Sequence, residues 1–324
     1  LTNASAQVRL YREKPTSAGS LPDESKYYSN DATSGSNYYK TLSLGAAGDT
    51  YNTAVYLKRN APGLSVSYLT AIGEDFLSNE LLFAMGDEQI NTDHVYRCSK
   101  RNLGLYMVRT DKYGERTFAY WRDGSAATQT LNVMTQAPDN IEMFYFSGIS
   151  VAILDVEQRE KLFDLINTLH SSGCRIVFDP NYRPHLWRDQ QEAQEWMDKS
   201  YQVADIAFPG GDDHLALYGH TTADDVLAHL APFGIGEVVM KNGAVGVHIV
   251  NHQGQFIVPV QTVTNVVDTT AAGDAFNGGY LAARLSGKNV TESASFGAMV
   301  AGTVIQHPGA IIPADTLRKA VTPL

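Results

Sequence analysis

The 324-residue sequence contains no apolar stretch of about 18 residues, the length that a membrane-spanning helix needs. Only two cysteines are present, Cys98 and Cys174, and because they lie far apart we expect reduced thiols. The nine histidines show no metal-ligand spacing, so no metal-binding residue is assigned. No basic and apolar leader is visible at the start. These features together predict a cytoplasmic protein without a membrane partner.

Positive charge is also scarce, since 25 Lys and Arg oppose 35 Asp and Glu and give a formal net charge of −10. This balance argues against nucleic acid or an anionic membrane surface as the main partner. If the ligands are anions, a few local cations and backbone N–H groups must overcome the background field.

Strand-like and helical segments alternate from about residue 141 onward. The segments "IEMFYFSG", "RIVFDPN" and "ADIAFPG" predict strands, and the stretches between them have helical spacing. Strands that are apolar throughout predict a mostly parallel sheet covered by helices on both faces. Earlier in the chain, "TYNTAVYLKRNA" and "NELLFAMGDEQ" predict helices and "LSVSYLTAIG" predicts a strand. We expect one α/β domain over residues 1–324.

The segment "LGLYMVRTDKYGERTFAYWRDGSA" alternates on both sides of a turn at residues 111–114, which is typical of an antiparallel hairpin. "AQVRLYRE" predicts one further short strand. We expect these strands to form a small β lid from about residues 1–44 and 95–123. An open sheet edge favours pairing with another copy, so a homo-oligomer through the lid is a hypothesis.

The segment "VVDTTAAGDAFNGGYLAARL" places small residues and one acid where a helix is predicted to begin. Three residues with almost no side chain leave the N–H groups of the helix N-terminus open to an anion: Ala271, Ala272 and Gly273. Asp274 would repel an anion, but its carboxylate can take the proton of a hydroxyl that attacks phosphorus. The segment indicates phosphoryl transfer to an alcohol, although residues 268–270 alone would fit an ordinary helix cap.

The part "DTTAAGDAF" resembles the D-T-x-G-A-G-D-x-F signature of the ribokinase-like carbohydrate kinases of the PfkB family. It departs at Ala271, where glycine is usual; a methyl group is tolerable there if the φ angle is negative. The resemblance runs from about residue 45 to 313. It implies a ribokinase-like three-layer α/β/α domain with a mostly parallel central sheet and a small β lid.

Within the family, "GERTFAYWR", "FSGIS", "FDPNYRPHLW" and "TVIQHPGAIIP" resemble the subgroup that phosphorylates 2-keto-3-deoxygluconate at its 6-hydroxyl. The resemblance implies ATP as phosphoryl donor, Mg²⁺ on the ATP phosphates and Asp274 as general base. Two alternatives stay open. One is a neutral-sugar kinase of the fructokinase or ribokinase type, and the other is a non-catalytic sugar-binding regulator, which the intact Asp274 disfavours.

The resemblance also implies residues that bind the sugar acid. "GAAGDTYNTAVYLKR" resembles an element that grips sugar hydroxyls, through Gly48, Asp49 and Asn52. One face of the lid hairpin would cover the substrate, with an arginine that pairs its carboxylate: Tyr106, Tyr120 and Arg122. Such a strand face also occurs simply as a solvated surface. Arg183 would bind the same carboxylate, or else form a salt bridge within a turn that Pro180 and Pro184 make rigid.

The nucleotide is expected against "KNGAVGV", through Lys241 and Gly243, with Gly309 and Ala310 framing the adenine. "AFPGGDDHLAL" stands where the family has an Asn-x-x-Glu motif, with Gly210 and Asp213 at the two positions. Asp179 and Asn181 are weaker candidates for substrate contacts. The family also begins with a strand ending in Gly-Glu or Gly-Asp, so we expect such a strand before Leu1 and an insertion at residues 20–43.

Overall fold

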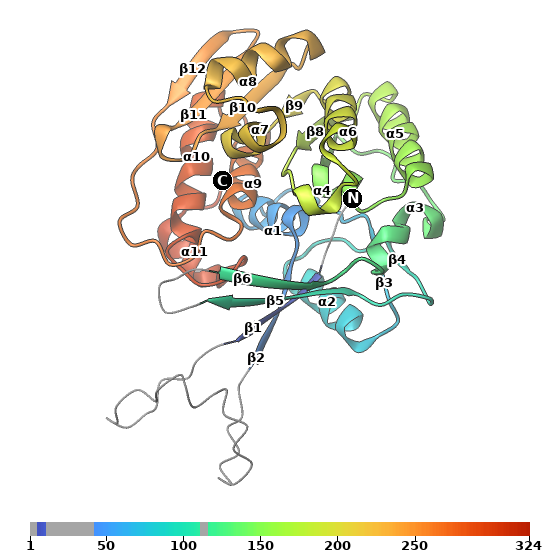
Figure 1. Cartoon of the computed structure of the whole chain (residues 1–324). Coiled ribbons are helices and arrows are strands. Elements are labelled where there is room, and N and C mark those ends of the chain that lie inside the picture. Colours follow the sequence, from blue (N-terminus) through green and yellow to red (C-terminus); the bar gives the residue numbers. More distant parts are fainter. Residues whose placement is uncertain (1–4, 11–41, 111–115) are drawn as a thin grey trace, which may run out of the picture.

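The computed structural model describes residues 5–10, 42–110 and 116–324. The expected insertion at residues 20–43 and the turn at 111–114 fall almost entirely outside these residues. The body is built on a six-stranded sheet with the order β12-β11-β10-β9-β8-β7 (Figure 1). Its strands are β7 (Met143–Ser147), β8 (Arg175–Asp179), β9 (Ile206–Ala207), β10 (Glu237–Lys241), β11 (Val247–Asn251) and β12 (Gly254–Val258).

Strands β7 to β10 pair in parallel, whereas β11 and β12 continue the sheet antiparallel. The predicted α/β sheet with a parallel centre is confirmed. Parallel strands bring their carboxyl ends to one edge of the sheet, so the residues that follow β7, β8, β9 and β10 lie at the same end of the body.

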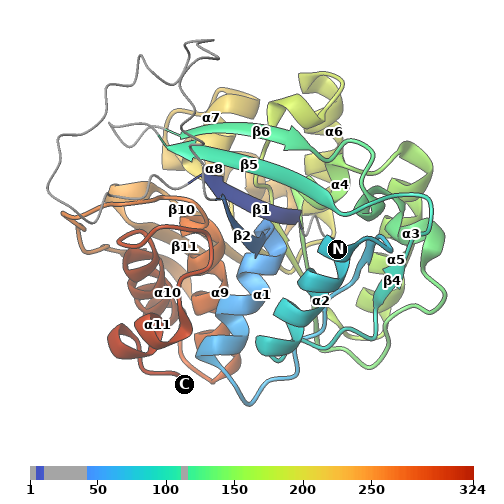
Figure 2. The same cartoon turned by 90° about the horizontal axis from the view of Figure 1, so that it is seen from below.

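Helices cover both faces of this sheet (Figure 2). One face carries α4 (Gly148–Ala152), α5 (Val156–Ser171), α6 (Gln190–Gln202), α7 (Gly211–Tyr218) and α8 (Ala223–Leu230). The other carries α1 (Asp49–Asn60), α9 (Ala272–Leu285) and α10 (Val290–Val304). Separate apolar clusters lie on the two sides, one around Phe146 and Leu162 and one around Phe208 and Tyr280. No helix within the described ranges is long and apolar enough to cross a membrane.

Glycine allows α9 to lie unusually close to α1. A Cβ on Gly278 would come within 2.7 Å of the Thr53 carbonyl oxygen and 2.8 Å of the Tyr56 Cβ. Such distances are shorter than van der Waals contact, so a side chain at this position would push the two helices apart. The close approach fixes the first turn of α9 beside the first turn of α1.

A second, two-stranded parallel sheet consists of β3 (Thr70–Ile72) and β4 (Val95–Arg97), next to α2 (Phe76–Asp87). The strand expected over residues 64–73 is therefore much shorter, because only the isolated bridge between Ser67 and Asn91 precedes β3. Residues 95–97, expected in the lid, pair with β3 instead. The remaining helices are α3 (Thr130–Val133) and α11 (Ala314–Ala320).

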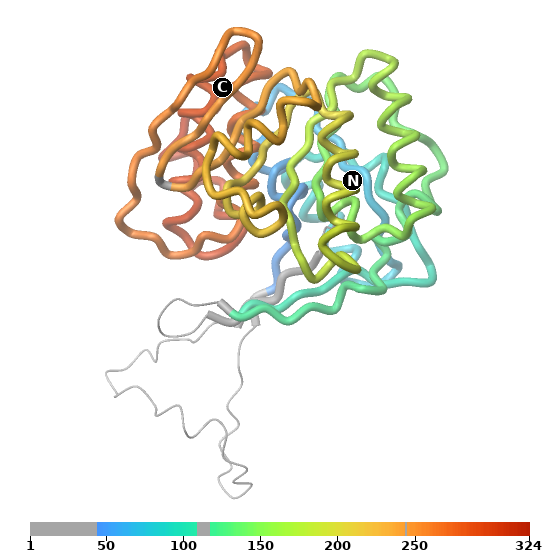
Figure 3. Tube along the Cα trace, turned by 45° about the horizontal axis from the view of Figure 1, so that its top comes forward, coloured from blue at the N-terminus to red at the C-terminus, as the bar shows by residue number. Residues whose placement is uncertain are grey.

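The lid sheet has the order β2-β1-β5-β6, from β1 (Ser5–Leu10), β2 (Leu42–Ala47), β5 (Gly104–Thr110) and β6 (Arg116–Trp121). The predicted hairpin is confirmed, since β5 and β6 pair antiparallel with Tyr106 opposite Tyr120. Figure 3 shows residues 104–110 and 116–121 crossing beneath the helical body. The lid thus faces the end of the body where the parallel strands terminate.

Candidate active site

A cavity of about 720 Å³ opens between the lid and the carboxyl ends of the body strands. It brings together most of the residues that the sequence singled out: Gly48, Asp49, Asn52, Tyr106, Tyr120, Arg122, Arg183, Lys241, Gly243, Ala271, Ala272, Gly273 and Asp274. The cavity is also lined by Phe118 of the lid and by Asp179, Asn181, Gly210 and Asp213 of the body. Residues that lie far apart in the sequence therefore meet in one space.

Ala271 does not have the negative φ angle that the sequence analysis required. It is the N-cap of α9 and adopts the left-handed conformation, with φ 61° and ψ 16°. The cause is the turn before the helix, where the Thr270 N–H donates to Asp268 Oδ1 at 2.9 Å and the Ala275 N–H donates to the Ala271 carbonyl at 2.8 Å. A methyl group in this conformation costs about 1–2 kcal/mol, which explains why glycine is usual at this position.

The first turn of α9 presents N–H groups to the cavity, and one cation, Lys241 of β10, lies beside it. The first N–H groups of a helix have no acceptor within the helix. The Ala272 N–H donates a long hydrogen bond to the Thr269 carbonyl, at 3.3 Å. This bond must break before the N–H group can bind an anion. Where a Cβ of Gly273 would stand, the Lys241 ammonium lies 3.5 Å away. The missing side chain thus leaves Lys241 beside the N-terminus of the helix.

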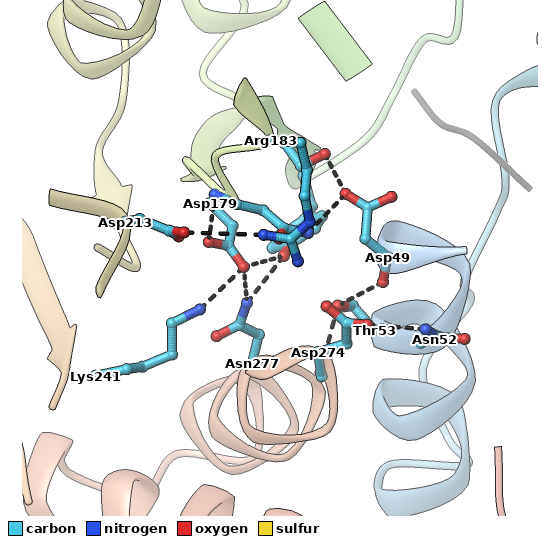
Figure 4. A network of polar contacts seen from close by, with 12 residues as sticks. Asp49, Asn52, Thr53, Asp179, Arg183, Asp213, Lys241, Asp274 and Asn277 are labelled. Carbon is cyan, nitrogen blue, oxygen red and sulfur yellow. Dashed lines mark hydrogen bonds and ion pairs between the residues drawn. The ribbon is translucent and has the colours of Figure 1, made fainter. Parts of the chain in front are cut away.

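Asp274 lies in the same turn and is held from α1 (Figure 4). Its Oδ2 accepts from Asn52 Nδ2 at 2.8 Å, and its backbone carbonyl accepts from Thr53 Oγ1 at 3.3 Å. Burial raises the pKa of Asp274 to about 8, and the nearby Asp49 carboxylate adds to the effect, against the Asn52 hydrogen bond and Lys241. A base whose pKa lies near working pH is well suited to proton transfer. The Asp274 carboxyl is half-buried and lines the cavity.

Asp179, at the end of β8, joins three elements of the site. Its buried carboxylate accepts from Lys241 Nζ of β10 at 3.0 Å and from Asn277 Nδ2 of α9 at 2.6 Å (Figure 4). The sequence analysis gave Asp179 a minor role and missed Asn277. Asn277 lies three residues after Asp274, which is about one turn of the predicted helix. This spacing could have placed the two side chains on one face of the helix. Asp179 fixes the position of the Lys241 ammonium.

Asp49 begins α1 and is held by two body residues. Its Oδ2 accepts from Ser147 Oγ at 2.5 Å and from Asn181 Nδ2 at 3.1 Å. Burial raises the pKa of Asp49, and the Ser147 hydrogen bond opposes this effect. The other oxygen, Oδ1, is buried at the cavity wall and has no hydrogen-bond partner in the part of the chain that the structure describes. An acceptor in that state suits a ligand hydroxyl. Ser147 was not foreseen from the sequence.

Two guanidinium groups reach the cavity from opposite sides, Arg122 from the lid and Arg183 from the turn after β8. Arg183 Nη1 donates to the Tyr182 carbonyl at 2.8 Å and lies 3.9 Å from Asp213 Oδ1, beyond hydrogen-bond distance. The salt bridge between Arg183 and Asp213, which was the alternative role for Arg183, is therefore weak. Burial raises the pKa of Asp213 to about 6, with Asp179 as the next cause. Neither arginine has a close bidentate carboxylate among the described residues.

Gly309 and Ala310 do not line the cavity. The Gly309 N–H donates to Asp268 Oδ2 at 2.9 Å, and the Ala310 carbonyl accepts from the Tyr56 hydroxyl at 2.8 Å. Ala310 is 1% exposed, so its side chain cannot touch a ligand in this arrangement. Gly309 instead ties its loop to the segment before α9. Within the described residues, no group of three or more His, Cys, Asp or Glu side chains is placed to hold a metal ion.

Comparison with known proteins gives a consistent result. The model of the "pfkB family carbohydrate kinase" matches residues 21–317. The 2-dehydro-3-deoxygluconokinase of Escherichia coli (strain K12) is 41% identical over 284 residues, covering 84% of this chain and 92% of that protein. The enzyme of the same name from Dickeya dadantii (strain 3937) is 39% identical over 287 residues, covering 85% and 92%.

Among solved structures, the aminoimidazole riboside kinase from Salmonella enterica complexed with aminoimidazole riboside and an ATP analogue has a TM-score of 0.78. It is 22% identical, and the match covers 99% of this chain and 98% of that one. The fructokinase with bound ATP from Xylella fastidiosa also has a TM-score of 0.78, at 21% identity over 98% and 96% of the chains. At these identities the two structures establish the shared fold alone.

The left-handed conformation of Ala271 predicts that Ala271→Gly stabilises the protein. Glycine adopts this conformation without the Cβ clash but loses more backbone freedom on folding, so the net gain should be about 0.5–1 kcal/mol. Urea unfolding at equilibrium measures it, with Ala272→Gly, in the helical first position, as the matched control. The control should lose stability. A loss of stability in Ala271→Gly would show that the conformation of this residue is not strained.

Proposed function

We propose that this chain, which belongs to the pfkB family of carbohydrate kinases, transfers the γ-phosphoryl group of ATP to the 6-hydroxyl of 2-dehydro-3-deoxygluconate, also called 2-keto-3-deoxygluconate. The relatives that carry this name support the proposal, since they are about two-fifths identical over most of the chain. The structural observation that carries it is a single cavity lined by the half-buried base Asp274 and by the two arginines Arg122 and Arg183.

The base end provides the groups for phosphoryl transfer. Asp274 accepts the proton of the 6-hydroxyl, and the oxygen of that hydroxyl attacks the γ-phosphorus. The bond from the γ-phosphorus to the bridging oxygen of ATP breaks, and ADP leaves. The N–H groups at the start of α9 and the Lys241 ammonium stabilise the charge that develops on the phosphoryl oxygens. Asp179 keeps Lys241 in place at 3.0 Å, so little reorganisation is needed when the phosphate arrives.

The arginine end provides selectivity for an acid. A substrate carboxylate can take two parallel hydrogen bonds from a guanidinium group, and Arg183 and Arg122 both lack such a partner among the described residues. The sugar hydroxyls would meet Asp49 and Asn52 on α1, and Tyr106 and Tyr120 would cover the chain from the lid. A neutral sugar would leave both arginines without a carboxylate partner, so the charge of the two guanidinium groups would contribute little to its binding.

The donor set also fits ATP with Mg²⁺. Gly243, with φ 51°, and Lys241 form the wall against which the nucleotide would lie. Mg²⁺ prefers oxygen ligands and retains several waters, and the Asp213 carboxylate, 3.9 Å from Arg183, is an oxygen donor of the required kind on this wall. When bound, the ion neutralises the negative charge of the ATP phosphates.

Two alternative functions fit the site less well. A neutral-sugar kinase would not need Arg122 and Arg183, and a sugar-binding regulator would not need a base with a raised pKa at Asp274. We propose in addition that the protein acts in the cytoplasm, where ATP is available. We also propose that two copies associate through the lid, whose edge strands β2 and β6 have one side without a strand partner among the described residues.

Asp274→Asn should reduce kcat by at least about 10²–10⁴-fold, the usual contribution of a general base. The substitution also removes a carboxylate whose ionisation burial disfavours, so stability to urea at pH 8 should not fall. Steady-state kinetics and urea unfolding of the same preparation test both points. A variant that retains more than about a tenth of the wild-type rate contradicts the role of Asp274.

The raised pKa predicts a pH dependence. Asp274 accepts a proton only when ionised, so kcat/KM should fall by about tenfold per pH unit below a pKa of about 8. Burial also raises the pKa of Asp213, to about 6, and Asp213→Asn should leave the limb near pH 8 in place. A profile that is flat between about pH 6 and 9 would rule out Asp274 as the titrating base.

Arg183→Ala should raise KM for 2-keto-3-deoxygluconate. The lost binding to the transition state should amount to about 2–5 kcal/mol. Arg122→Ala should act in the same direction, because Arg122 lines the same cavity and is the less exposed of the two arginines. KM for ATP should change little in either variant. Wild-type kcat/KM for the acid, fructose and ribose supplies the comparison, and equal use of a neutral sugar would favour the fructokinase-like alternative.

A further inference from the structure

His185 lies outside the cavity but contacts two lid residues that line it. It belongs to the short turn Pro184–Leu186, after β8. Its ring stacks on Tyr120 with centroids 5.6 Å apart, and its Nε2 lies 3.1 Å from Arg122 Nη2. The Arg122 guanidinium lies 4.3 Å above the Tyr120 ring. These three side chains form a closed cluster between the lid and the body.

The chemistry of the contact determines the protonation state of His185. A guanidinium group has five donors and no acceptor, so the imidazole Nε2 must accept and the ring proton must be on Nδ1. A protonated imidazole has no acceptor and would repel the guanidinium. The hydrogen bond between Arg122 and His185 therefore exists only while His185 is neutral.

The two sides of the contact differ in rigidity. The turn that carries His185 is anchored by the buried side chains of Tyr182 and Trp187 on either side, and the Leu186 N–H donates to the Arg183 carbonyl at 3.0 Å. On the lid side, β6 is an edge strand and Tyr120 is 41% exposed. The fixed turn can therefore hold the lid, rather than the reverse.

We propose that neutral His185 is a positioning residue, which holds Arg122 at the mouth of the cavity to receive the substrate carboxylate, and that protonation of His185 releases the lid. This inference rests on the proposed function for the identity of the ligand. His185 does not line the cavity, so we expect it to act on binding of the sugar acid rather than on the chemical step.

The surroundings of His185 set the direction of the pH effect. Partial burial lowers the pKa of His185 first, followed by the charges of Arg122 and Arg183, and Asp123 opposes them. The neutral form therefore predominates at and above the ordinary histidine pKa of about 6.5. The contact is lost as the pH falls through the lowered value, and KM for the sugar acid should rise there.

Three substitutions of His185 separate the effect of its hydrogen bond to Arg122 from the effect of its charge. His185→Ala should raise KM for 2-keto-3-deoxygluconate by about 3- to 10-fold at pH 7.5, the scale of one hydrogen bond, with kcat and KM for ATP unchanged. His185→Gln retains an acceptor that does not titrate, so it should restore KM and weaken its rise between about pH 7.5 and 5.5. His185→Lys places a permanent cation beside Arg122 and should raise KM most. His252→Ala, in an exposed turn, is the control.

One measurement does not depend on the substrate. The pKa of His185, measured by NMR in the substrate-free protein, should rise in Arg122→Ala, because a neighbouring cation has been removed. An unchanged pKa would overturn the contact itself. If the pKa rises but wild type does not use the sugar acid, the proposed function fails and the contact stands. An effect of His185→Ala on kcat alone, or a KM within about twofold of wild type, would overturn the positioning role.

Discussion

The site depends on the burial of an acid at the start of a helix. The first turn of a helix carries partial positive charge, which favours an anionic ligand, and Asp274 would compete with that ligand if it were ionised throughout. Burial beside Asp49 raises the pKa of Asp274 to about 8. Asp274 can therefore gain and lose a proton near working pH. This condition requires α1 and α9 in close contact, which Gly278 allows. The base and its hydrogen-bond partner Asn52 are thus placed by helix packing.

The same cavity has to attract anions within a protein of net charge −10. It does so with few cations, each fixed differently. Lys241 is held by the buried Asp179, whose carboxylate also accepts a hydrogen bond from Asn277 of α9. Arg183 and Arg122 are held by a backbone carbonyl and by an imidazole, neither of which is an anion. The arginines therefore retain their charge for a ligand carboxylate, whereas Lys241 is partly neutralised near the base.

Local sequence was sufficient for the parts of the site that lie on one segment. "DTTAAGDAF" predicted the helix start, the small residues and the acid, and the alternating hairpin predicted the lid face with Tyr120 and Arg122. The left-handed conformation of Ala271 was not foreseen, because it is set by the preceding turn around Asp268. The contacts of Asp179 with Lys241 and Asn277 join segments 62 and 98 residues apart, which no local pattern reveals. Residues 95–97 were assigned to the lid because strand propensity does not specify a partner.

We infer that a single cavity orients a sugar acid with its carboxylate at the arginines and its 6-hydroxyl at Asp274. A crystal structure with 2-keto-3-deoxygluconate and a non-hydrolysable ATP analogue tests this claim most directly. The account predicts the 6-hydroxyl in hydrogen-bond contact with the Asp274 carboxylate, and the substrate carboxylate on Arg183 and Arg122. A substrate bound with its carboxylate toward the start of α9, or with both arginines unpaired, would contradict it.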